Sequence, residues 1–322
     1  MLKYILRRLL QMIPVILVIS MLLFCLVKAM PGDPINAYLG VNSKVAPELK
    51  ERLKVKLGLD KPIPIQYAMW LKRMATGDFG ESIIYKRPVK EVAGNFLWNT
   101  FLLNIVTFIL SFLISIPIGI ICAVKQYSKT DNFWTLFSLI GISMPSFFFG
   151  LLLIFGLSVK LKLFPISGMI TAGSDYSGMA YVVDVVKHMI LPATVITIGS
   201  LASLVRYVRN SMLEVVKQDY IRTARSKGLS EKVVIYKHAF RNALIPIVTL
   251  IGIYIPFLFT GSVIIERVFV WPGIGRVLYE GVMMRDYNIV MTLNMFFALL
   301  MLMGNLLQDI GYAIVDPRVK VE

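Results

Sequence analysis

The side chains in this sequence that are best suited to chemistry lie in a polar, basic stretch from Arg206 to Arg241. The stretch holds nine of the 34 Lys and Arg residues and is bordered on both sides by long apolar segments. Clustered cations attract anionic partners, so the stretch could lie on acidic lipid or dock another protein. Both roles are binding roles rather than catalytic ones. We call this stretch the basic insert.

Cap and turn residues predict a short helix in the middle of the basic insert. Asp219 is the predicted N-cap, and the helix is expected to run from Tyr220 to Lys227. Gly228 then supplies a left-handed terminator, and Leu229 is the hydrophobic residue that commonly follows one. The predicted helix is therefore only about two turns long.

A further helix is predicted to follow, capped by Ser230 and with the acidic Glu231 in its first turn. In the first helix, Ala224 and Gly228 are four residues apart, so both small residues are expected on one side. That geometry would let another surface approach the backbone closely. Positive charge around such a contact would come from Arg222, Arg225 and Lys227. The pattern fits a protein-docking surface and equally an amphipathic helix on anionic lipid.

Catalytic and metal-binding patterns are missing from the sequence. No G-x-x-x-x-G-K-[ST] loop occurs, so the chain is not expected to bind ATP by itself. His188 and His238 are the only histidines, and no Cys/His cluster has the spacing of metal ligands. No G-x-S-x-G turn is present either. We therefore expect a protein that is not an enzyme and that binds no metal or cofactor, so that any energy must enter from another chain.

The composition is that of an integral membrane protein. Hydrophobic residues make up 57% of the chain and charged residues 16%, against about 25% charged residues in soluble domains. The net charge of +15 raises the question of nucleic acid. However, the basic residues lie in loops between apolar spans, where retention beside anionic lipid explains them more simply. We expect no nucleic-acid partner. Cys25 and Cys122 lie in separate apolar runs and are expected to be unbridged.

Six apolar stretches are long enough to cross a hydrocarbon core of about 30 Å, and all should be helical. They are Leu9–Val27, Leu97–Val124, Phe133–Val159, Met189–Val205, Leu244–Ile265 and Ile289–Gln308. Lys3, Arg7 and Arg8 favour a cytoplasmic N-terminus, and six spans then place the C-terminus in the cytoplasm as well. The first stretch is longer than the apolar core of a cleaved signal peptide, so we expect it to be retained.

The six predicted spans contain no Asp, Glu, Lys, Arg or His. Ion-coupled carriers generally place ionisable groups inside the membrane, so this absence argues against that class. Four small polar residues of the second and third spans could line a polar path: Asn104, Thr107, Ser111 and Ser143. Such residues also form hydrogen bonds between packed helices. Both interpretations stay open.

Two segments outside the spans are expected to be structured on the outer side of the membrane. Residues 31–96 contain two predicted short helices, Pro47–Leu57 and Pro62–Met74. Residues 266–288 contain a turn at Trp271–Gly275 with a helix after it. The expected organisation is residues 1–30 with the first span, 31–96 as an outer loop, and 97–322 as a core that includes the inner loop 206–243 and the outer loop 266–288.

A series of short motifs runs through nearly the whole chain. They are Pro31-Gly-Asp-Pro34, Leu57-Gly-Leu-Asp60, Gln66-Tyr67, Trp70-Leu71, Gly77-Asp-Phe-Gly80, Asp219-Tyr-Ile-Arg-Thr-Ala-Arg-Ser-Lys-Gly-Leu-Ser230, His238, Asn242-Ala243, Pro246, Glu266, Trp271-Pro-Gly-Ile-Gly275, Arg285-Asp-Tyr287 and Asp316-Pro-Arg318. In this order they resemble binding-protein-dependent ABC transporter permeases. Within these, the chain is similar to the B-type permease subunit of the dipeptide, oligopeptide and nickel branch.

The resemblance implies the type I ABC importer permease fold, an all-α integral membrane protein with six transmembrane helices and a cytoplasmic coupling helix. It implies that the basic insert docks on an ATPase through Asp219, Tyr220, Arg222, Ala224, Arg225, Lys227, Gly228, Leu229 and Ser230. Where such permeases usually have Glu-Ala-Ala, this chain has Arg222-Thr-Ala224, and only the last alanine is kept. Contacts with a binding protein are expected from Glu266, Trp271, Gly273, Gly275 and Arg285.

The function implied is that of a permease subunit of an ATP-driven importer in a bacterial cytoplasmic membrane. The chain would form half of a path for di- or oligopeptides. Its expected partners are a homologous second permease in a heterodimer, two cytoplasmic ATPase subunits that hold ATP and Mg²⁺, and an extracytoplasmic binding protein. One alternative is import of nickel or a metal chelate by the same machine. A more distant one is a stand-alone ion-coupled carrier or channel.

Overall fold

The computed structural model describes residues 2–29, 47–56 and 58–315. Within these ranges the chain is built from helices and the turns that join them, and its only β-pairing is an isolated bridge between Glu81 and Pro88. The expected all-α architecture is therefore confirmed. The motifs Pro31-Gly-Asp-Pro34 and Asp316-Pro-Arg318 lie outside the described residues, as does Leu57.

In the described part of the chain, four long helices are apolar enough over a sufficient length to cross a membrane: α1 (Leu2–Ala29), α5 (Val89–Val124), α8 (Gly178–Val216) and α14 (Tyr287–Val315). They correspond to the first, second, fourth and sixth predicted spans. The fifth corresponds to α11 (Phe240–Thr260). At a rise of about 1.5 Å per residue, a helix of 21 residues is about 31 Å long, which matches the hydrocarbon core.

The third predicted span, Phe133–Val159, is not one straight helix. It is divided into α6 (Lys129–Ser143), α7 (Ser146–Leu153) and the π-helical turn η1 (Ile154–Lys160), with a bend of 101° at the break. Met144 is extended there, with ψ 123°. A proline disfavours the helical conformation in the residue before it, so Pro145 explains why the apolar run breaks at this point. The two arms of this bend, residues 129–143 and 146–160, are long and apolar enough to cross a membrane only if they are taken together as one span.

The fifth predicted span also ends earlier than expected. The sequence predicted continuation to Ile265, but α11 ends at Thr260 and Gly261 follows with φ +67°. A new short helix, α12 (Val263–Val268), starts after its N-cap Ser262, whose hydroxyl accepts a hydrogen bond from Ile265 N at 3.4 Å. The chain therefore turns back at this level instead of running straight out of the bundle.

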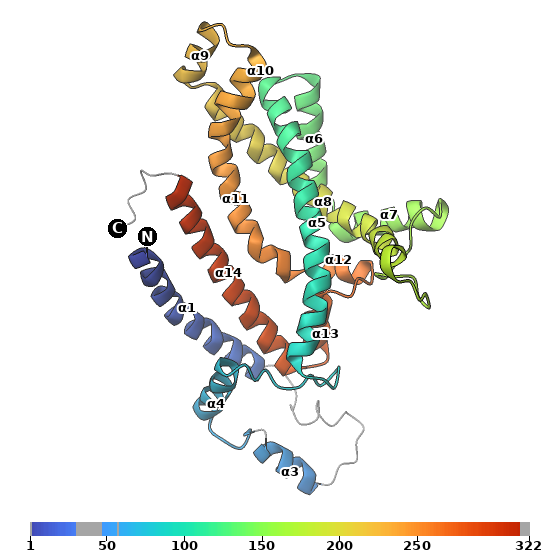
Figure 1. Ribbon diagram of the computed structural model, residues 1–322. Coiled ribbons are helices and arrows are strands. Elements are labelled where there is room, and N and C mark those ends of the chain that lie inside the picture. Colours follow the sequence, from blue (N-terminus) through green and yellow to red (C-terminus); the bar gives the residue numbers. More distant parts are fainter. Residues whose placement is uncertain (1, 30–46, 57, 316–322) are drawn as a thin grey trace.

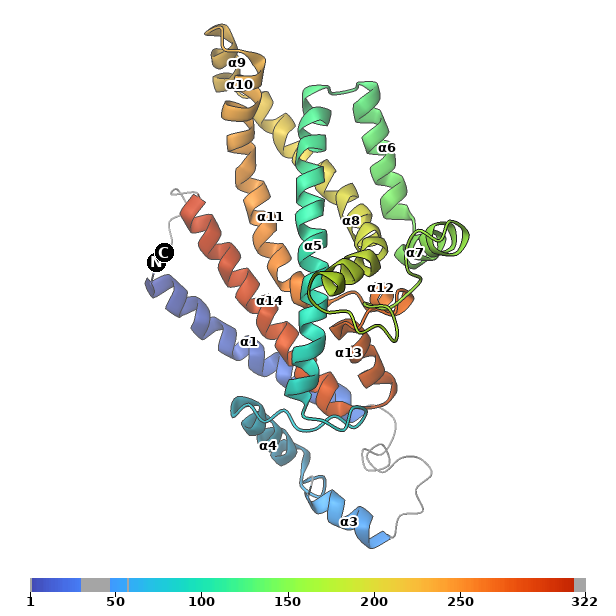
Figure 2. The same cartoon turned by 45° about the vertical axis from the view of Figure 1, so that its right-hand side comes forward.

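The helices pack around α5, α8 and α11, and α1 lies outermost against α14 (Figures 1 and 2). Arg8 near the start of α1 forms an ion pair at 3.2 Å with Asp309 near the end of α14. The start of α1 and the end of α14 therefore lie on the same side of the molecule. The outer helix α4 (Ile63–Ala75) packs on α1 through Tyr67 and Trp70, which contact Phe24.

The two short helices expected in the outer loop are present as α3 (Pro47–Lys56) and α4, with Gly58 in the left-handed region at φ +68°. The segment between α4 and α5 is joined to the end of α13 (Ile274–Met283) and to α14 by Asp286. Its carboxylate accepts hydrogen bonds from Ser82 Oγ at 2.6 Å and Ile84 N at 3.1 Å. The segment between α4 and α5 is thus fastened to the same end of the molecule as the end of α13.

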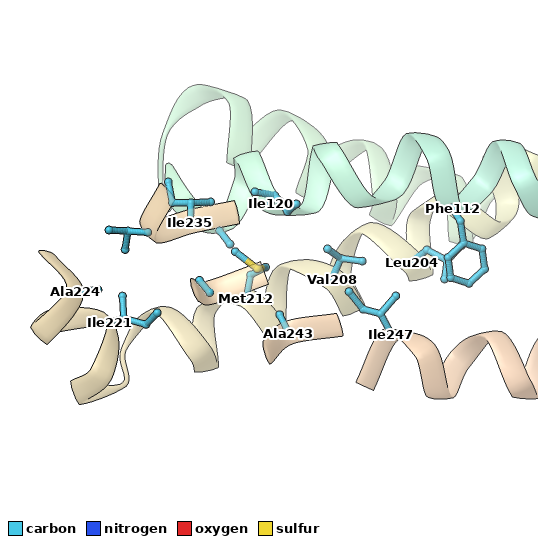
Figure 3. Close-up of a cluster of buried hydrophobic side chains, with 13 residues drawn as sticks. Phe112, Ile120, Leu204, Val208, Met212, Ile221, Ala224, Ile235, Ala243 and Ile247 are labelled. Atoms are coloured by element: carbon cyan, nitrogen blue, oxygen red, sulfur yellow. The ribbon is translucent and has the colours of Figure 1, made fainter. Parts of the chain in front are cut away.

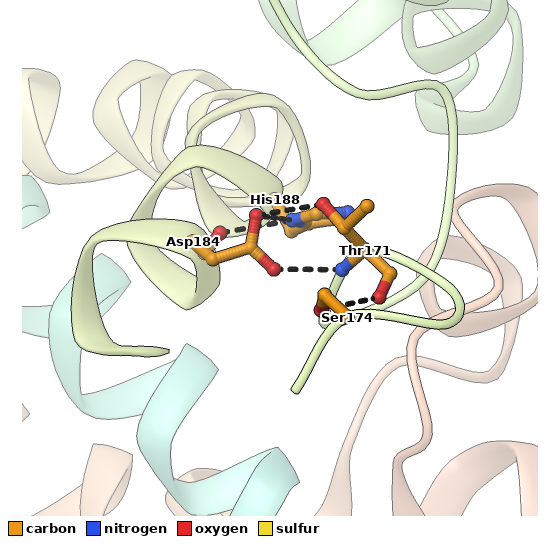
Figure 4. A network of polar contacts seen from close by, with 4 residues as sticks. All are labelled: Thr171, Ser174, Asp184 and His188. Atoms are coloured by element: carbon orange, nitrogen blue, oxygen red, sulfur yellow. Dashed lines mark hydrogen bonds and ion pairs between the residues drawn. The ribbon is translucent and has the colours of Figure 1, made fainter. Parts of the chain in front are cut away.

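A polar network ties the loop after η1 to the first turns of α8 (Figure 4). Asp184 accepts hydrogen bonds from Thr171 N at 2.6 Å and from Thr171 Oγ1 at 2.8 Å. His188 Nδ1 lies 2.8 Å from the backbone oxygen of Asp184, and Ser174 Oγ donates to Thr171 O at 2.7 Å. The network holds the loop on α8 at the level of α7.

Candidate docking site at the end of the bundle

The basic insert forms a projecting cap at one end of the helical bundle. Beyond α8 the chain folds into α9 (Asp219–Ser226), α10 (Glu231–Val233) and the π-helical turn η2 (Val234–Ala239), which leads into α11. This cap lies at the opposite end of the molecule from α4 and α13 (Figures 1 and 2). The sequence predicts the basic insert on one side of the membrane and residues 31–96 and 266–288 on the other. In the structure, the helices of these two groups accordingly lie at opposite ends of the molecule.

One face of α9 is anchored in the hydrophobic core of the cap (Figure 3). Ile221 is fully buried and Ala224 is 6% exposed, and both belong to a cluster with Met212 of α8 and Val234 of η2. The same cluster continues along the bundle to Phe112 of α5. Burying a side chain such as isoleucine stabilises a fold by about 1.5–3 kcal/mol, which holds this two-turn helix in place.

The opposite face of α9 and the turn after it are open. The exposed residues include the remaining candidates for ATPase coupling: Asp219, Tyr220, Arg222, Arg225, Lys227, Gly228, Leu229 and Ser230. Two of them are apolar, with Tyr220 45% and Leu229 41% exposed. A Cβ atom at Gly228 would meet nothing within 4 Å. The exposed surface of the cap is thus basic at its edges and offers an open glycine and two apolar side chains.

The expectation that Ala224 and Gly228 share one exposed face of small residues is wrong for Ala224. Its side chain packs inward on the cluster, so it is not on the exposed side with Gly228. The helical spacing that put the two residues on one side fails because Gly228 lies beyond the helix, where φ is +74° and the chain turns away. Ala224 therefore supports the docking surface from below, and Gly228 is part of the surface.

The predicted caps are partly confirmed. Gly228 has the expected left-handed conformation and ends the helix. Asp219, by contrast, is the first helical residue, and Gln218 is the N-cap, without a side-chain capping bond. Asp219 still suits the positive end of the helix dipole. Ser230 is the N-cap of α10, but its hydroxyl makes no capping bond.

An exposed ion pair joins α9 to α10. Arg225 donates to Glu231 from Nη2 at 2.8 Å and from Nε at 3.2 Å. This hydrogen bonding lowers the pKa of the Glu231 carboxyl and raises the pKa of Arg225. Burial raises the pKa of the Tyr220 phenol, which also contacts the side chain of Asn242. The surface around these contacts is positively charged, because Arg222, Lys227 and other cations are exposed there.

A buried ion pair below the cap was not predicted from the sequence. Asp131 in the first turn of α6 is 1% exposed and accepts two hydrogen bonds from Arg209 of α8, at 2.6 and 2.8 Å. It also accepts from Tyr127 N at 2.9 Å, while its own N–H donates to the N-cap Ser128 Oγ at 3.3 Å. The S-x-x-D pattern at Ser128 is a capping-box signal that could have marked this helix start, which the apolar run predicted at Phe133 instead. Nothing local indicated Arg209 as the partner.

The residues expected to contact a binding protein lie mostly inside the molecule. Glu266 is 1% exposed and Trp271 is fully buried, and Gly273 and Gly275 are buried around the Glu266 carboxylate. This expectation is wrong for these four residues, because their side of the turn faces the start of α5. Arg285 alone is exposed, at φ +59°.

The Glu266 carboxylate holds the turn onto α5. It accepts hydrogen bonds from Thr100 Oγ1 at 2.9 Å and from Arg276 N at 2.8 Å. A Cβ at Gly273 would collide with Glu266 Cδ, so the position next to the carboxylate has room only for glycine. Burial raises the pKa of Glu266 to about 7. Glu266 and the Trp271–Gly275 turn therefore hold α5 and α13 together inside the molecule.

Of the four candidate path residues, one bonds to a neighbouring helix, two are buried and one is exposed. Asn104 Nδ2 donates to Phe257 O at 3.1 Å and to Leu258 O at 3.2 Å, where α11 approaches its end. Thr107 is buried and donates to Asn104 O at 2.9 Å, and Ser111 is buried as well. Ser143 is exposed and donates to Leu139 O at 2.8 Å. Within this chain, the geometry of Asn104 fits the interhelical interpretation, and a path lined by these residues stays a prediction.

Comparison with known families and proteins gives a consistent result. The family model described as "Binding-protein-dependent transport system inner membrane component" matches residues 115–321. A second model, for the N-terminal part of binding-protein-dependent transport system membrane components, matches residues 1–88. Together the two models cover nearly all of the chain.

Curated relatives match over their full lengths. The oligopeptide transport system permease protein AppB of Bacillus subtilis is 44% identical over 318 residues, with 98% of this chain and 99% of the relative covered. The dipeptide transport system permease protein DppB of Escherichia coli is 38% identical over 337 residues, with 99% of each covered. A putative peptide permease protein of Brucella ovis is 39% identical over 322 residues, with both chains fully covered.

Among solved structures, a chain of the MetNI methionine ABC transporter has a similar fold. The TM-score is 0.53 at 17% identity, and the match covers 70% of this chain and 97% of the other. At this identity the similarity concerns the fold alone.

Proposed function

The chain belongs to the family of binding-protein-dependent transport system inner membrane components, and on that basis we propose that it is the permease subunit of an ATP-driven peptide importer. Two of its relatives are named as oligopeptide and dipeptide permease proteins and match end to end. Those names support peptides as the cargo. None of the three relatives is named for nickel, and the described residues include no group of three or more His, Cys, Asp or Glu that could hold a metal ion.

The observation that carries the coupling role is the two-sided construction of α9. The buried face of α9 packs into a hydrophobic cluster that reaches α8 and α5, while its opposite face is exposed and positively charged. A force on the exposed face of α9 is therefore transmitted to the membrane helices instead of being absorbed by a flexible loop. We infer that a cytoplasmic ATPase binds this face, and that closure of two ATPase subunits on ATP moves the cap.

The complete transporter in this proposal contains four further proteins. A homologous second permease completes the translocation path, two ATPase subunits bind at the cap end, and an extracytoplasmic protein delivers peptide at the other end. The end of α13 supports the last contact, because Met283, Met284 and Arg285 are exposed there, whereas the glycine turn at the start of the same helix is buried. The cap and both chain termini then lie in the cytoplasm of a bacterial cell.

Substitution of Gly228 tests the coupling role. Gly228→Leu adds a bulky side chain at the open position of the docking surface, and we expect peptide-stimulated ATP hydrolysis and peptide uptake to fall by roughly tenfold or more in the assembled transporter in vesicles. A leucine at positive φ also costs about 1–2 kcal/mol of backbone strain. Gly228→Asn reduces this strain, since asparagine tolerates the left-handed conformation, and it should still impair coupling.

Gly173 provides a matched control. It has φ +76°, a Cβ atom there would meet nothing within 4 Å, and it lies in the exposed loop before α8. Gly173→Leu therefore carries the same strain and exposure at a site remote from α9, and it should leave coupling intact. Normal coupled uptake in Gly228→Leu, with the variant inserted in the membrane at the usual level, would refute the docking role.

A further inference from the structure

A lateral cavity lies between α6 and α8, close to the cap. It has a volume of about 160 Å³ and reaches inward to Cys122 of α5. Two contacts between α6 and α8 lie on either side of it. At one, a Cβ on Gly141 would be 3.6 Å from Ala202 Cβ, and at the other Asp131 binds Arg209 at 2.6 Å. The cavity therefore lies between a packing contact on one side and an ion pair on the other.

The wall of the cavity is divided by polarity. Arg206, Arg209 and Asn210 of α8 line it toward the cap, and Leu139 of α6 and Val205 of α8 line it toward the middle of the bundle. Asp131 engages Arg209 through Nε and Nη2. Arg206 is exposed and has no ion-pair partner among the residues that the structure describes. The cap side of the cavity therefore carries a positive charge that no acidic group of the described residues neutralises.

The surroundings of the cavity are those of a membrane–water boundary. The outer face of α6 next to it is apolar, with Phe133 and Leu136 more than half exposed. Trp134 lines the cavity, and tryptophan is enriched where hydrocarbon meets headgroups. A positive pocket between membrane helices on the cytoplasmic side is a site for acidic lipid headgroups. The volume is below the range of drug-sized pockets, which suits one headgroup fragment with its acyl chains outside.

We propose that this cavity binds the phosphate headgroup of an anionic phospholipid, with Arg206 and Asn210 holding the phosphate and the acyl chains lying along Leu139. This rests on the proposed function for the orientation of the cap. The chemistry fits because guanidinium and amide N–H groups donate to phosphate oxygens, and an arginine binds them in a fork-like geometry. The bound headgroup would lie on α8 only a few residues before Met212, which packs under α9.

Trp134 gives a direct readout. The assembled transporter is reconstituted in bilayers that contain brominated phosphatidylglycerol or brominated phosphatidylcholine, and bromine quenching of tryptophan fluorescence is measured. The contribution of Trp134 is the difference between the wild type and Trp134→Phe. We expect this contribution to be quenched at a several-fold lower fraction of phosphatidylglycerol than of phosphatidylcholine. Inorganic phosphate in the buffer should not relieve the quenching, because the bound species is a lipid.

Charge-matched variants separate a site from general surface attraction. Arg206→Gln should abolish the preference for phosphatidylglycerol, while Lys129→Gln, an exposed residue of α6 that does not line the cavity, should preserve it. Equal quenching by the two lipids, relief by free phosphate, or an unchanged preference in Arg206→Gln would overturn the proposal. The measurement does not depend on transport, so selective quenching in a protein without peptide-stimulated ATP hydrolysis would refute the proposed function alone.

Discussion

Glu266 shows how a single buried carboxylate joins α5 to the turn before α13. Its oxygens accept hydrogen bonds from Thr100 of α5 and from the first turn of α13, and a side chain at Gly273 would collide with it. The glycines that the sequence displays as a turn are therefore explained by the space that this carboxylate occupies. Local sequence patterns could identify the turn, but not the contact with Thr100, which is 166 residues away along the chain.

Glu266 is expected to make the stability of the transporter depend on pH. Burial raises its pKa to about 7 from the ordinary 4.5, so the folded state keeps a proton that the unfolded state loses between these values. The stabilisation is complete below about pH 4.5 and is lost as the pH rises through 7, by up to about 3 kcal/mol. The melting temperature of the solubilised complex should therefore fall between pH 5 and about pH 7.5, in the direction set by linkage.

Glu266→Gln removes the titrating group at nearly the same volume. Its melting temperature should change less over the same pH range than that of the wild type. Parallel melting curves for the two proteins across the range would show that Glu266 does not titrate in it.

At the scale of helices, the ion pair between Asp131 and Arg209 joins α6 to α8 beneath the cap. The carboxylate is buried and the guanidinium is 19% exposed at its side chain, so water screens the pair only weakly. Salt bridges at the surface contribute little by comparison. Arg225 and Glu231, whose side chains are 43% and 53% exposed, form a surface pair in the same region. The two pairs therefore allow a controlled comparison.

Asp131→Asn should loosen the contact of α6 with α8. Loss of one partner of a buried pair leaves the other charge unpaired and costs about 3–5 kcal/mol, and the partial exposure of Arg209 favours the lower end. Cys122 lines the cavity beside this contact and is 1% exposed. In a Cys25→Ser background, its labelling by a thiol reagent should become markedly faster.

Glu231→Gln is the control for this comparison, because loss of an exposed pair costs less than about 1 kcal/mol. It should leave the labelling rate of Cys122 unchanged. A rate in Asp131→Asn equal to that of the control would show that the ion pair does not hold α6 in place.

The helices themselves were largely predictable from the sequence, since long uncharged apolar runs identify spans and Gly228 identifies the end of α9. A kink at Pro145 was left open and the early end of α11 at Gly261 was missed, because apolarity alone does not distinguish a straight span from a broken one. The inward position of Ala224 was missed for a related reason. Helical spacing predicts a shared face only while the helix continues, and here it ends before Gly228.

At the scale of the whole molecule, the two ends of the helical bundle differ in structure and are joined by long helices. The cap at α9 presents a basic surface with an open glycine, and the opposite end presents α4 and the exposed end of α13 (Figure 1). A permease that receives energy at one end and substrate at the other needs this arrangement. The central claim is therefore that α9 is the surface that contacts the ATPase.

Site-specific photo-crosslinking tests this claim most directly. A photoreactive phenylalanine analogue is placed at Leu229, just after α9, or at Met284, just after α13; both residues are exposed, and the two helices lie at opposite ends of the molecule. The account predicts that Leu229 crosslinks to an ATPase subunit in the intact cell and Met284 does not, with Met284 crosslinking to the extracytoplasmic binding protein. An ATPase crosslink from Met284, or crosslinks from Leu229 to lipid only, would contradict it.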